Sequence, residues 1–305
     1  MESKKYPDKS GFVAVMGRPN VGKSTLINVL IGEKIAAVSP WPQTTRKRQL
    51  GILTTDLGQI IFVDTPGIHN PFHKLGKHMN EEARSVLEDS DVILIVVDVS
   101  QPPNEEDQLL ANIILRLTRS IPVLLALNKI DLVNSGILED NSTAFEVLYP
   151  NMNARIQTSA TLGDNLDGII ALLFEYLPDG PPFFPKDQIT DLYEREIASD
   201  LIREAALYHL RDEVPHSIAV RIDEFTERSD RGAFIAATLF VERDSQKGIV
   251  IGKNGKMLKQ IGTLARIEIE NMSGRKVYLK LRVKVRKNWR NDEASLKLFG
   301  FRKSQ

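Results

Sequence analysis

The sequence predicts two domains, an α/β domain with a mostly parallel sheet and a smaller α+β domain after it. In the first part of this 305-residue chain, short continuous apolar runs alternate with helical stretches, and such runs are typical of strands buried on both faces. In the last third, the predicted order is helix, strand, strand, helix, helix and strand, which is an α+β pattern. A proline-rich stretch, LPDGPPFFPKD, separates the two regions. We therefore expect domains at residues 1–177 and 189–305, joined by a linker at 178–188.

The expected elements follow from these patterns in chain order. The strands of the first domain are expected at 12–16, 60–63, 92–97, 123–127 and 155–158, where the apolar runs lie. The second domain is expected to begin with a helix at 192–210 and two strands at 217–226 and 234–242. A helical pair interrupted by glycine, at 248–261, and a last strand at 277–285 complete it.

Composition and charge narrow the functional classes. With 42% hydrophobic and 26% charged residues, the chain has the composition of an ordinary globular protein. It contains no cysteine, which excludes disulfides and thiolate metal sites and leads us to expect the cytoplasm. No apolar run approaches the ~20 residues of a membrane helix, so we expect neither a span nor a secretion signal. The net charge of zero hides a basic end: from Gln246 onward there are 16 Lys and Arg against 4 Asp and Glu, which favours a polyanionic partner.

A phosphate-binding loop follows the first predicted strand. The segment GRPNVGKS fits G-x-x-x-x-G-K-S between a strand and a helix, the context that this motif requires. Its glycines allow a tight turn that points N–H groups at phosphate, and the following helix adds its positive end. Lys23 is expected to reach the outer phosphates, and Ser24 to bind Mg²⁺. The nucleotide-binding residues expected here are Gly17, Arg18, Pro19, Asn20, Val21, Gly22, Lys23, Ser24 and Thr25.

Two further motifs end buried strands. In DTPG, Asp64 can reach Mg²⁺ through water, and the Gly67 N–H can sense a γ-phosphate. In NKID, the carboxylate of Asp131 matches the adjacent N1–H and 2-amino donors of guanine, a pair that adenine lacks, so GTP is favoured over ATP. Lys129 is expected along the ring face, and Asn128 is expected to hold neighbouring loops together. A weaker element is the pair Ser159 and Ala160, whose backbone N–H groups can meet the guanine O6.

The ordered set GRPNVGKS, DTPG, NKID and TSA resembles the translation-factor-related class of P-loop GTPases. The resemblance implies an α/β P-loop GTPase domain that binds GTP, GDP and Mg²⁺. It also implies a switch I threonine between the first two motifs, for which Thr44 and Thr45 in WPQTTR are candidates. Family similarity favours Thr45 as the third metal ligand beside Ser24 and Asp64, although spacing does not separate the two threonines. Lys23, Thr45 and Gly67 are the expected catalytic residues.

One departure from Ras-like GTPases affects the expected mechanism. Ile68 occupies the position of their water-orienting glutamine, so we expect slow hydrolysis that depends on Mg²⁺, on the P-loop and on a group from a partner or a monovalent cation. Asn20 matches an asparagine that helps to hold K⁺ in potassium-activated relatives, and a loop-shaping role is the alternative. We interpret His69, His73 and His78 as surface residues of the switch loop rather than as a metal site.

The basic second domain carries a loop typical of RNA-binding folds. Within GIVIGKNGKMLKQIG, the G-x-x-G loop IGKNG lies between two helical turns. Glycines let the backbone of single-stranded RNA approach, and flanking lysines meet its phosphates. This loop and the order of elements predict a type II KH domain. The RNA-binding residues expected in the loop are Gly252, Lys253, Asn254, Gly255 and Lys256.

The last predicted strand alternates apolar and basic side chains. Period two places its valines and leucines on the core side and four basic residues outside: Lys280, Arg282, Lys284 and Arg286. Their position beside the KH loop favours contact with RNA. Protection of an exposed edge strand against aggregation is the alternative.

A GTPase domain, this linker and a type II KH domain together resemble the bacterial Era family over nearly the whole chain. The resemblance implies binding of the 3′ end region of small-subunit rRNA in the GTP state, release after hydrolysis, and a role in maturation of the 30S-type ribosomal precursor. Peripheral contact with the inner face of the membrane is also described for such proteins. A GTPase acting on a protein or membrane partner, with the basic tail as a lipid-binding patch, is the alternative. We expect a monomer.

Overall fold

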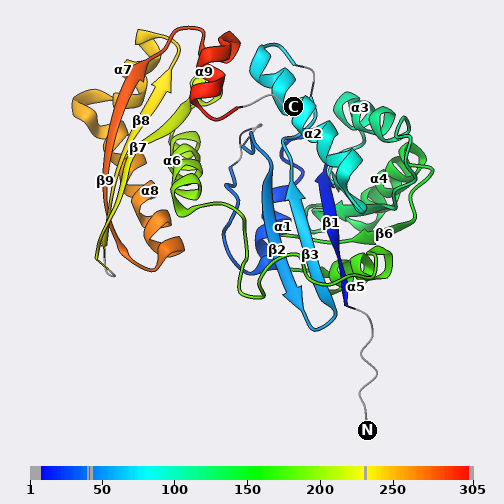
Figure 1. The fold of residues 1–305 in the computed structure, drawn as a ribbon. Coiled ribbons are helices and arrows are strands. Elements are labelled where there is room, and N and C mark those ends of the chain that lie inside the picture. The colour runs from blue at the N-terminus through cyan, green and yellow to red at the C-terminus, as the bar shows by residue number, and fades with distance from the viewer. Residues whose placement is uncertain (1–7, 40, 42–43, 70, 230–231, 302–305) are drawn as a thin grey trace.

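The computed structural model describes residues 8–39, 41, 44–69, 71–229 and 232–301. The chain forms two domains that lie beside each other, and the segment after the first domain leads into the second (Figure 1). Both expected domains are therefore present. No helix in the described parts of the chain has the length and apolar character needed to cross a membrane.

The first domain is built on a six-stranded sheet. The strands are β1 (Lys9–Met16), β2 (Gln49–Thr55), β3 (Gly58–Asp64), β4 (Val92–Asp98), β5 (Val123–Asn128) and β6 (Ala154–Gln157), and their order is β2-β3-β1-β4-β5-β6. All neighbouring pairs are parallel except β2 and β3, which are antiparallel. The sequence did not predict β2. An edge strand buries less of its surface than the central strands, so β2 lacks the continuous apolar run that marks β1, β3, β4 and β5.

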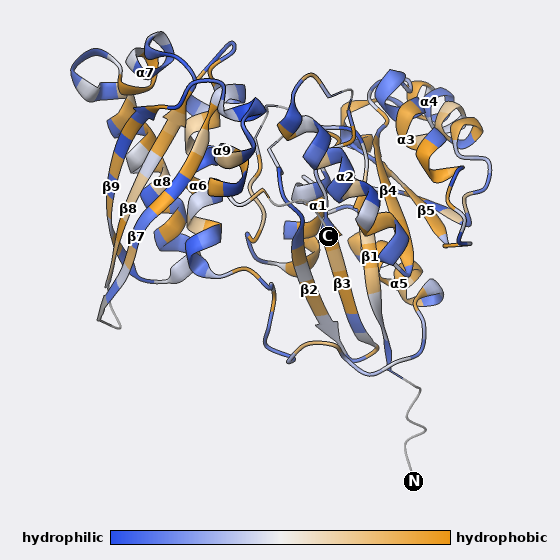
Figure 2. Ribbon diagram, turned by 45° about the horizontal axis from the view of Figure 1, so that its top comes forward, coloured by the Kyte–Doolittle hydropathy of each residue, from blue (hydrophilic) through white to orange (hydrophobic). Residues whose placement is uncertain are grey.

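Helices cover both faces of this sheet. The helices α1 (Lys23–Ile31) and α5 (Leu166–Tyr176) pack against one face, and α2 (Lys74–Asp89), α3 (Glu105–Ile114) and α4 (Ser135–Leu148) pack against the other. Successive β1 residues alternate between these layers: Val13 and Val15 contact the first core, and Ala14 and Met16 contact the second. Figure 2 shows the resulting hydrophobic colouring along the central strands.

The second domain has the predicted order of elements, followed by a helix, α9 (Glu293–Leu298), that the sequence did not predict. Its elements are α6 (Glu194–His209), β7 (Ala219–Ser229), β8 (Gly232–Val241), α7 (Asp244–Ile251), a short 3₁₀ helix (Lys253–Gly255), α8 (Lys256–Ser273), β9 (Lys276–Val285) and α9 (Glu293–Leu298). The sheet order is β7-β8-β9, with β7 antiparallel and β9 parallel to β8. Helices α6 and α8 contribute to a single core on one face of this sheet. Helix α8 extends past the predicted end at 261 because Ala265 and Ile269 continue its buried side.

The connection between α5 and α6 packs along the first domain. The side chain of Gln59 accepts hydrogen bonds from the N–H groups of Phe183 and Phe184 at 2.9 Å, and the Ile52 N–H donates to the Ile189 carbonyl. The expected linker at 178–188 falls within this connection, and its limits stay a prediction.

A small apolar cluster joins the two domains. Leu75 and Met79 of α2 are fully buried in a cluster with residues of the second domain, among them Phe240 and Trp289. Helix α9 lies beside α2 at this junction (Figure 1). The helix that follows the DTPG motif therefore packs directly on the KH-like domain.

Candidate nucleotide and RNA sites

The loop between β1 and α1 has a conformation that requires glycine at two positions. Gly17 and Gly22 have φ values of 150° and 102°. A Cβ atom at Gly17 would lie 2.3 Å from the Val96 carbonyl oxygen, and one at Gly22 would lie 2.4 Å from Asn128 Nδ2. The tight turn and the start of α1 together present backbone N–H groups to an anion.

A cavity of about 630 Å³ opens above this loop. The expected nucleotide-site residues that line it are Arg18, Pro19, Asn20, Gly22, Lys23, Ser24, Thr25, Thr45, Gly67, Asn128, Lys129 and Ala160. Four others, Gly17, Val21, Asp64 and Ser159, are buried behind this lining. Asp131 is exposed, on a short 3₁₀ helix (Ile130–Leu132), and does not line the cavity. The structure thus brings most of the predicted site together around one cavity.

Lys23 is held inside the phosphate-binding loop. Its side chain is buried, and its ammonium donates to the carbonyl oxygens of Gly17 and Arg18, both at 2.9 Å. Burial lowers the pKa of Lys23 to about 8, although the nearby Asp64 acts in the opposite direction. A phosphate at the cavity floor would supply the counter-charge that this buried ammonium favours.

Three oxygen-bearing side chains meet beside Lys23. Ser24 Oγ lies 2.9 Å from Thr45 Oγ1 and donates to Asp64 Oδ2 at 2.7 Å, and Thr45 Oγ1 donates to the same oxygen at 3.0 Å. The other carboxylate oxygen, Asp64 Oδ1, is buried and makes no hydrogen bond within the described residues. Oxygen ligands of this kind suit Mg²⁺, and the unbonded oxygen is available to a metal-bound water.

The geometry separates the two candidate threonines. Thr44 Oγ1 donates to the Trp41 carbonyl oxygen at 2.8 Å and lies 2.7 Å from Ser39 Oγ. Its hydroxyl therefore turns back into its own loop, whereas Thr45 points at Ser24 and Asp64. Gly67 approaches the same region, because a Cβ atom there would lie 2.8 Å from the Pro19 backbone nitrogen.

The NKID loop is tied to the phosphate-binding loop. Asn128 donates through Nδ2 to the Val21 carbonyl at 2.8 Å and accepts from the Ala160 N–H at 3.0 Å. Lys129 donates to the Asn20 carbonyl at 2.8 Å. These bonds hold the three loops that would surround a nucleotide in one arrangement.

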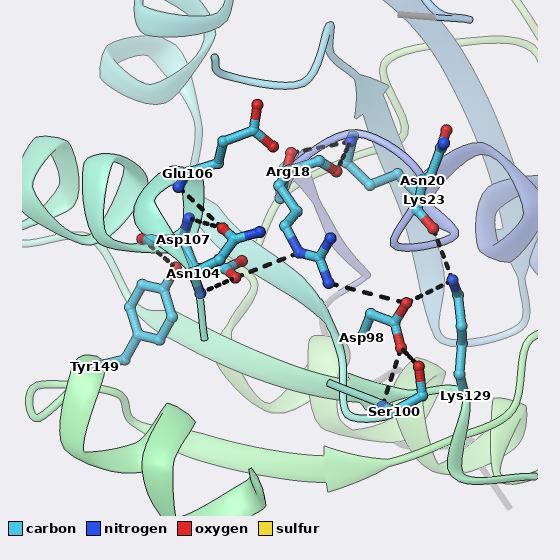
Figure 3. Close-up of polar contacts among 11 residues, drawn as sticks. Arg18, Asn20, Lys23, Asp98, Ser100, Asn104, Glu106, Asp107, Lys129 and Tyr149 are labelled. Carbon is cyan, nitrogen blue, oxygen red and sulfur yellow. Dashed lines mark hydrogen bonds and ion pairs between the residues drawn. The ribbon is translucent and has the colours of Figure 1, made fainter. Parts of the chain in front are cut away.

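Sequence reasoning missed Asp98, which joins Lys129 to the P-loop arginine (Figure 3). The Asp98 carboxylate accepts from Lys129 Nζ at 2.7 Å and lies 3.9 Å from the guanidinium of Arg18, which also lies 3.3 Å from Asp107. Burial opposes the charged form of Asp98, but hydrogen bonds from Lys129 and Ser100 outweigh it and lower its pKa. The sequence did offer one indication that Asp98 belongs to the site, because this residue ends an apolar strand, as Asp64 and Asn128 do.

One expectation about the histidines was wrong. His69 is only 5% exposed, and its Nδ1 lies 2.9 Å from the Gly67 carbonyl oxygen. Asn80 Nδ2 donates to the backbone carbonyl of His69 at 2.7 Å, which fixes this residue inside the fold rather than on its surface. His73 caps α2, and His78 lies 3.3 Å from Glu293.

The G-x-x-G loop lies between α7 and α8. Gly252 has a φ of 71°, and a Cβ atom there would lie 2.6 Å from Met257 Cβ, so this position requires glycine. Lys253, Asn254 and Lys256 are exposed. A groove of about 390 Å³ runs from Gly255 along α8 to β9, where Leu279 and Leu281 line it. A groove that combines leucines with Lys259 and Arg266, beside an exposed lysine loop, suits single-stranded RNA.

The basic residues of the last strand lie on the other side of the sheet. Leu279 and Leu281 face the groove, and because side chains alternate along a strand, Lys280, Arg282 and Lys284 face away from α8, where all three are exposed. Arg286 comes after the end of β9. Its guanidinium donates to Ser295 Oγ and lies 3.6 Å from Asp292, so it is already paired within the domain.

Comparisons with known proteins agree with this geometry. Residues 12–129 match the family model described as 50S ribosome-binding GTPase, and residues 213–290 match the KH domain model. GTPase Era of Geobacter metallireducens is 47% identical over 296 residues, covering 97% of this chain and 98% of that protein. GTPase Era of Staphylococcus haemolyticus is 44% identical over 297 residues, with 97% and 98% coverage.

Two solved structures are similar over nearly the whole chain. A crystal structure of Era in complex with MgGDPNP and nucleotides 1506–1542 of 16S ribosomal RNA has a TM-score of 0.91 and 40% identity, covering 96% of this chain and 99% of that one. A variant of Aquifex aeolicus Era bound to GDP and AlF₄⁻ has a TM-score of 0.90, with the same identity and coverage. With both domains matched in order, the chain belongs to the Era family and is a GTPase that carries a KH domain.

Proposed function

We propose that the protein is a GTP-driven switch that binds the 3′ end region of small-subunit rRNA through its KH domain and assists maturation of the small ribosomal subunit in the cytoplasm. The observation that carries this proposal is the packing of α2 on the KH domain. Leu75 and Met79 are buried against that domain, eight and twelve positions after Gly67, the expected sensor of the γ-phosphate. A change at Gly67 would thus alter the packing between the domains.

The nucleotide end of the switch is assigned to the cavity residues. Lys23 binds the outer phosphates, and Ser24, Thr45 and Asp64 hold Mg²⁺ directly or through water. The metal supplies charge neutralisation at the transferred phosphoryl group. Ile68 is 1% exposed and apolar, so it cannot orient the attacking water, and hydrolysis is expected to be slow in the isolated protein. The relative solved with MgGDPNP supports this assignment.

The RNA end of the switch is assigned to the KH groove. Gly252 and Gly255 let the RNA backbone approach, Lys253 and Lys256 meet phosphates, and the groove along Leu279 and Leu281 takes unstacked bases. Lys280, Arg282 and Lys284 offer a second basic surface on the opposite face of the sheet. The Era structure that contains nucleotides 1506–1542 of 16S rRNA supports this choice of RNA.

The proposal requires that nucleotide and RNA affect each other's affinity. The full chain bound to GDPNP should bind a single-stranded RNA of the 16S 3′ end about tenfold more tightly than the chain bound to GDP, and by linkage the RNA should raise the affinity for GDPNP relative to that for GDP by the same factor. Fluorescence anisotropy measures both arms, with an RNA of scrambled sequence as control. Equal RNA affinity in the two states would contradict the proposal, and binding to anionic vesicles without RNA binding would favour the lipid-binding alternative.

We also propose that Asn20 helps to hold a K⁺ ion beside the phosphates. Asn20 lines the cavity in a left-handed conformation with a φ of 64°, and Lys129 fixes its backbone carbonyl. A monovalent cation there would act on the charge that develops during hydrolysis. The single-turnover rate should be about tenfold higher in KCl than in NaCl, and Asn20→Ala should remove the difference. Equal rates of the unmodified protein in the two salts would remove the cation from the mechanism.

A further inference from the structure

Two buried arginines connect the KH domain to the residues on either side of Thr45. Arg203 lies on α6 of the KH domain and donates from its guanidinium to the Thr44 carbonyl oxygen. Arg46 reaches in the opposite direction and donates to the carbonyl oxygens of Ile218 and His216, at 2.7 and 3.0 Å. Both side chains are buried between the domains, and each arginine is only 6% exposed.

Further contacts make this junction specific. The Arg46 guanidinium lies 5.7 Å from the centre of the Trp289 ring, and Trp289 is fully buried with its indole N–H donating to the Ser217 carbonyl. Asp200, one helical turn before Arg203, accepts a hydrogen bond from Gln49 Nε2 at 2.6 Å. Its carboxylate attracts both guanidinium groups. Buried guanidinium groups that are hydrogen-bonded to carbonyl oxygens, with a carboxylate nearby, define one arrangement of the neighbouring backbone.

The two arginines repel each other, so the junction depends on its partners. Burial lowers the pKa of Arg203 to about 10 and moves the pKa of Arg46 in the same direction, and the Arg203 charge contributes to the effect on Arg46. Each guanidinium is stabilised by groups of the other domain: Arg203 by a switch I carbonyl, and Arg46 by carbonyls of the KH domain. Separation of the domains would remove both sets of bonds at once.

We propose that Arg203 and Arg46 are positioning residues through which the KH domain holds switch I so that Thr45 faces the magnesium site. The peptide oxygen before Thr45 is fixed by Arg203, and the side chain after it is fixed in the KH domain. Between these two anchors the Thr45 hydroxyl meets Ser24 and Asp64 at 2.9 and 3.0 Å. The inference rests on the proposed role of Thr45 as a metal ligand, and it assigns part of the GTP site to the RNA-binding domain.

The test compares two nucleotides that differ in their need for Thr45. On the proposed assignments, GDPNP with Mg²⁺ requires Thr45, whereas GDP is expected to be held mainly by the P-loop and the NKID loop. In the full chain, Arg203→Gln and Arg46→Gln should each weaken GDPNP binding by about tenfold and raise the Mg²⁺ concentration needed for it, while GDP affinity changes by less than about twofold. Arg203→Lys, which keeps the charge and a donor, should recover part of the loss.

The matched control is Arg195→Gln. Arg195 lies on the same helix and donates to the Ile222 carbonyl at 2.6 Å, but this bond stays within the KH domain. The Arg195→Gln variant should leave the affinities for GDP and GDPNP unchanged. Equal losses for GDP and GDPNP in the Arg203 and Arg46 variants, or no loss for either, would overturn the inference.

Thr45→Ala separates this inference from the proposal on which it rests. If Thr45→Ala leaves the ratio of GDPNP to GDP affinity unchanged, the assigned role of Thr45 fails. If Thr45→Ala lowers that ratio and the arginine variants do not, the role of Thr45 stands and the positioning by the KH domain fails. A lowered ratio in all three variants, with Arg195→Gln unaffected, is the expected result.

Discussion

At the scale of single residues, the nucleotide site combines fixed and exposed side chains. Three buried residues are the last residues of strands β3, β4 and β5: Asp64, Asp98 and Asn128. Each is hydrogen-bonded to another loop of the site. Asp131 differs because it is exposed on a short 3₁₀ helix at the rim. The buried residues set the shape of the site, whereas Asp131 is available to read the base.

Asp131→Asn should change the base preference without changing the fold. An amide offers only one acceptor to the two guanine donors and adds a donor that repels them, so GDP affinity should fall by about tenfold or more. Xanthosine diphosphate, which carries an acceptor in place of the 2-amino group, should bind better than it does to the unmodified protein. Titration with both nucleotides measures the change, and Asp140→Asn, at an exposed position of α4, is the control. Unchanged GDP affinity in Asp131→Asn would refute the base-reading assignment.

At the scale of elements, α2 shows how a local cap responds to its surroundings. His73 is the N-cap, and its Nδ1 accepts the Gly76 N–H at 3.0 Å, which requires a neutral ring nitrogen. Burial lowers the pKa of His73 to about 4, and the positive charges of Arg290 and Arg46 act in the same direction. The cap of the helix that joins the domains is therefore sensitive to acid.

The sign of this effect follows from the two pKa values. In the unfolded chain a histidine has a pKa near 6.5. Neutral His73 therefore contributes its full stabilising free energy above about pH 6.5, and this contribution is lost progressively as the pH falls toward 4. Between pH 7 and pH 5 the unmodified protein should lose about 1 kcal/mol more of its unfolding free energy than His73→Asn, after allowance for the partial exposure of the ring. Asparagine keeps a capping acceptor but does not titrate.

Urea titrations followed by tryptophan fluorescence at the two pH values measure the difference, because buried Trp289 lies at the same junction. Equal losses of stability in the two proteins would show that the cap contributes nothing to the acid response.

The G-x-x-G loop shows the opposite situation, a local element with few neighbours. A Cβ atom at Gly255 would meet no described atom within 4 Å, and Lys253 and Asn254 are exposed. The loop conformation is set by the glycines and by the ends of α7 and α8, so the sequence could predict it. Its exposure leaves it free to meet RNA.

At the scale of the whole molecule, one chain keeps two sites apart and connects them through one junction. Residues 1–185 hold 16 basic and 22 acidic residues, whereas residues 186–305 hold 24 and 18. A polyanion is therefore attracted to the KH domain and repelled by the GTPase domain. The apolar cluster around Trp289 and the arginines at switch I are among the contacts that link the two domains, together with the ion pairs of Lys34 with Glu204 and Glu268.

Lys253→Asp combined with Asn254→Asp should separate RNA binding from GTP hydrolysis. The change places two negative charges where phosphates approach, so RNA affinity should fall by roughly tenfold to a hundredfold. Hydrolysis without RNA should stay within about twofold, since the loop makes no contact with the GTPase domain in the described structure. The control is Asn271→Asp with Lys276→Asp, the same change of charge at exposed positions of the same domain. Unchanged RNA binding in the loop variant would remove the assignment of RNA binding to the G-x-x-G loop.

Much of the architecture follows from local patterns in the chain. The P-loop, NKID and G-x-x-G motifs predicted the loops correctly because glycine conformation and the neighbouring strand and helix fix their shape within a few residues. Strands β1, β3, β4 and β5 were found because each carries a continuous apolar run. Edge strand β2 was missed because it lacks this run, and the far end of α8 was missed because its buried side continues beyond the glycine-interrupted pattern.

The sequence by itself determined that this chain has a guanine-nucleotide site and a KH loop, because each motif contains within itself the groups that its ligand requires. Only the tertiary structure decided which polar residues pair across the fold: Asp98 with Lys129, Arg286 with Asp292, and Arg203 with the Thr44 carbonyl. The last of these joins residues 159 positions apart. Such a contact has no local pattern, since it depends on how two separately formed cores pack together, and that packing places switch I within reach of the RNA-binding domain.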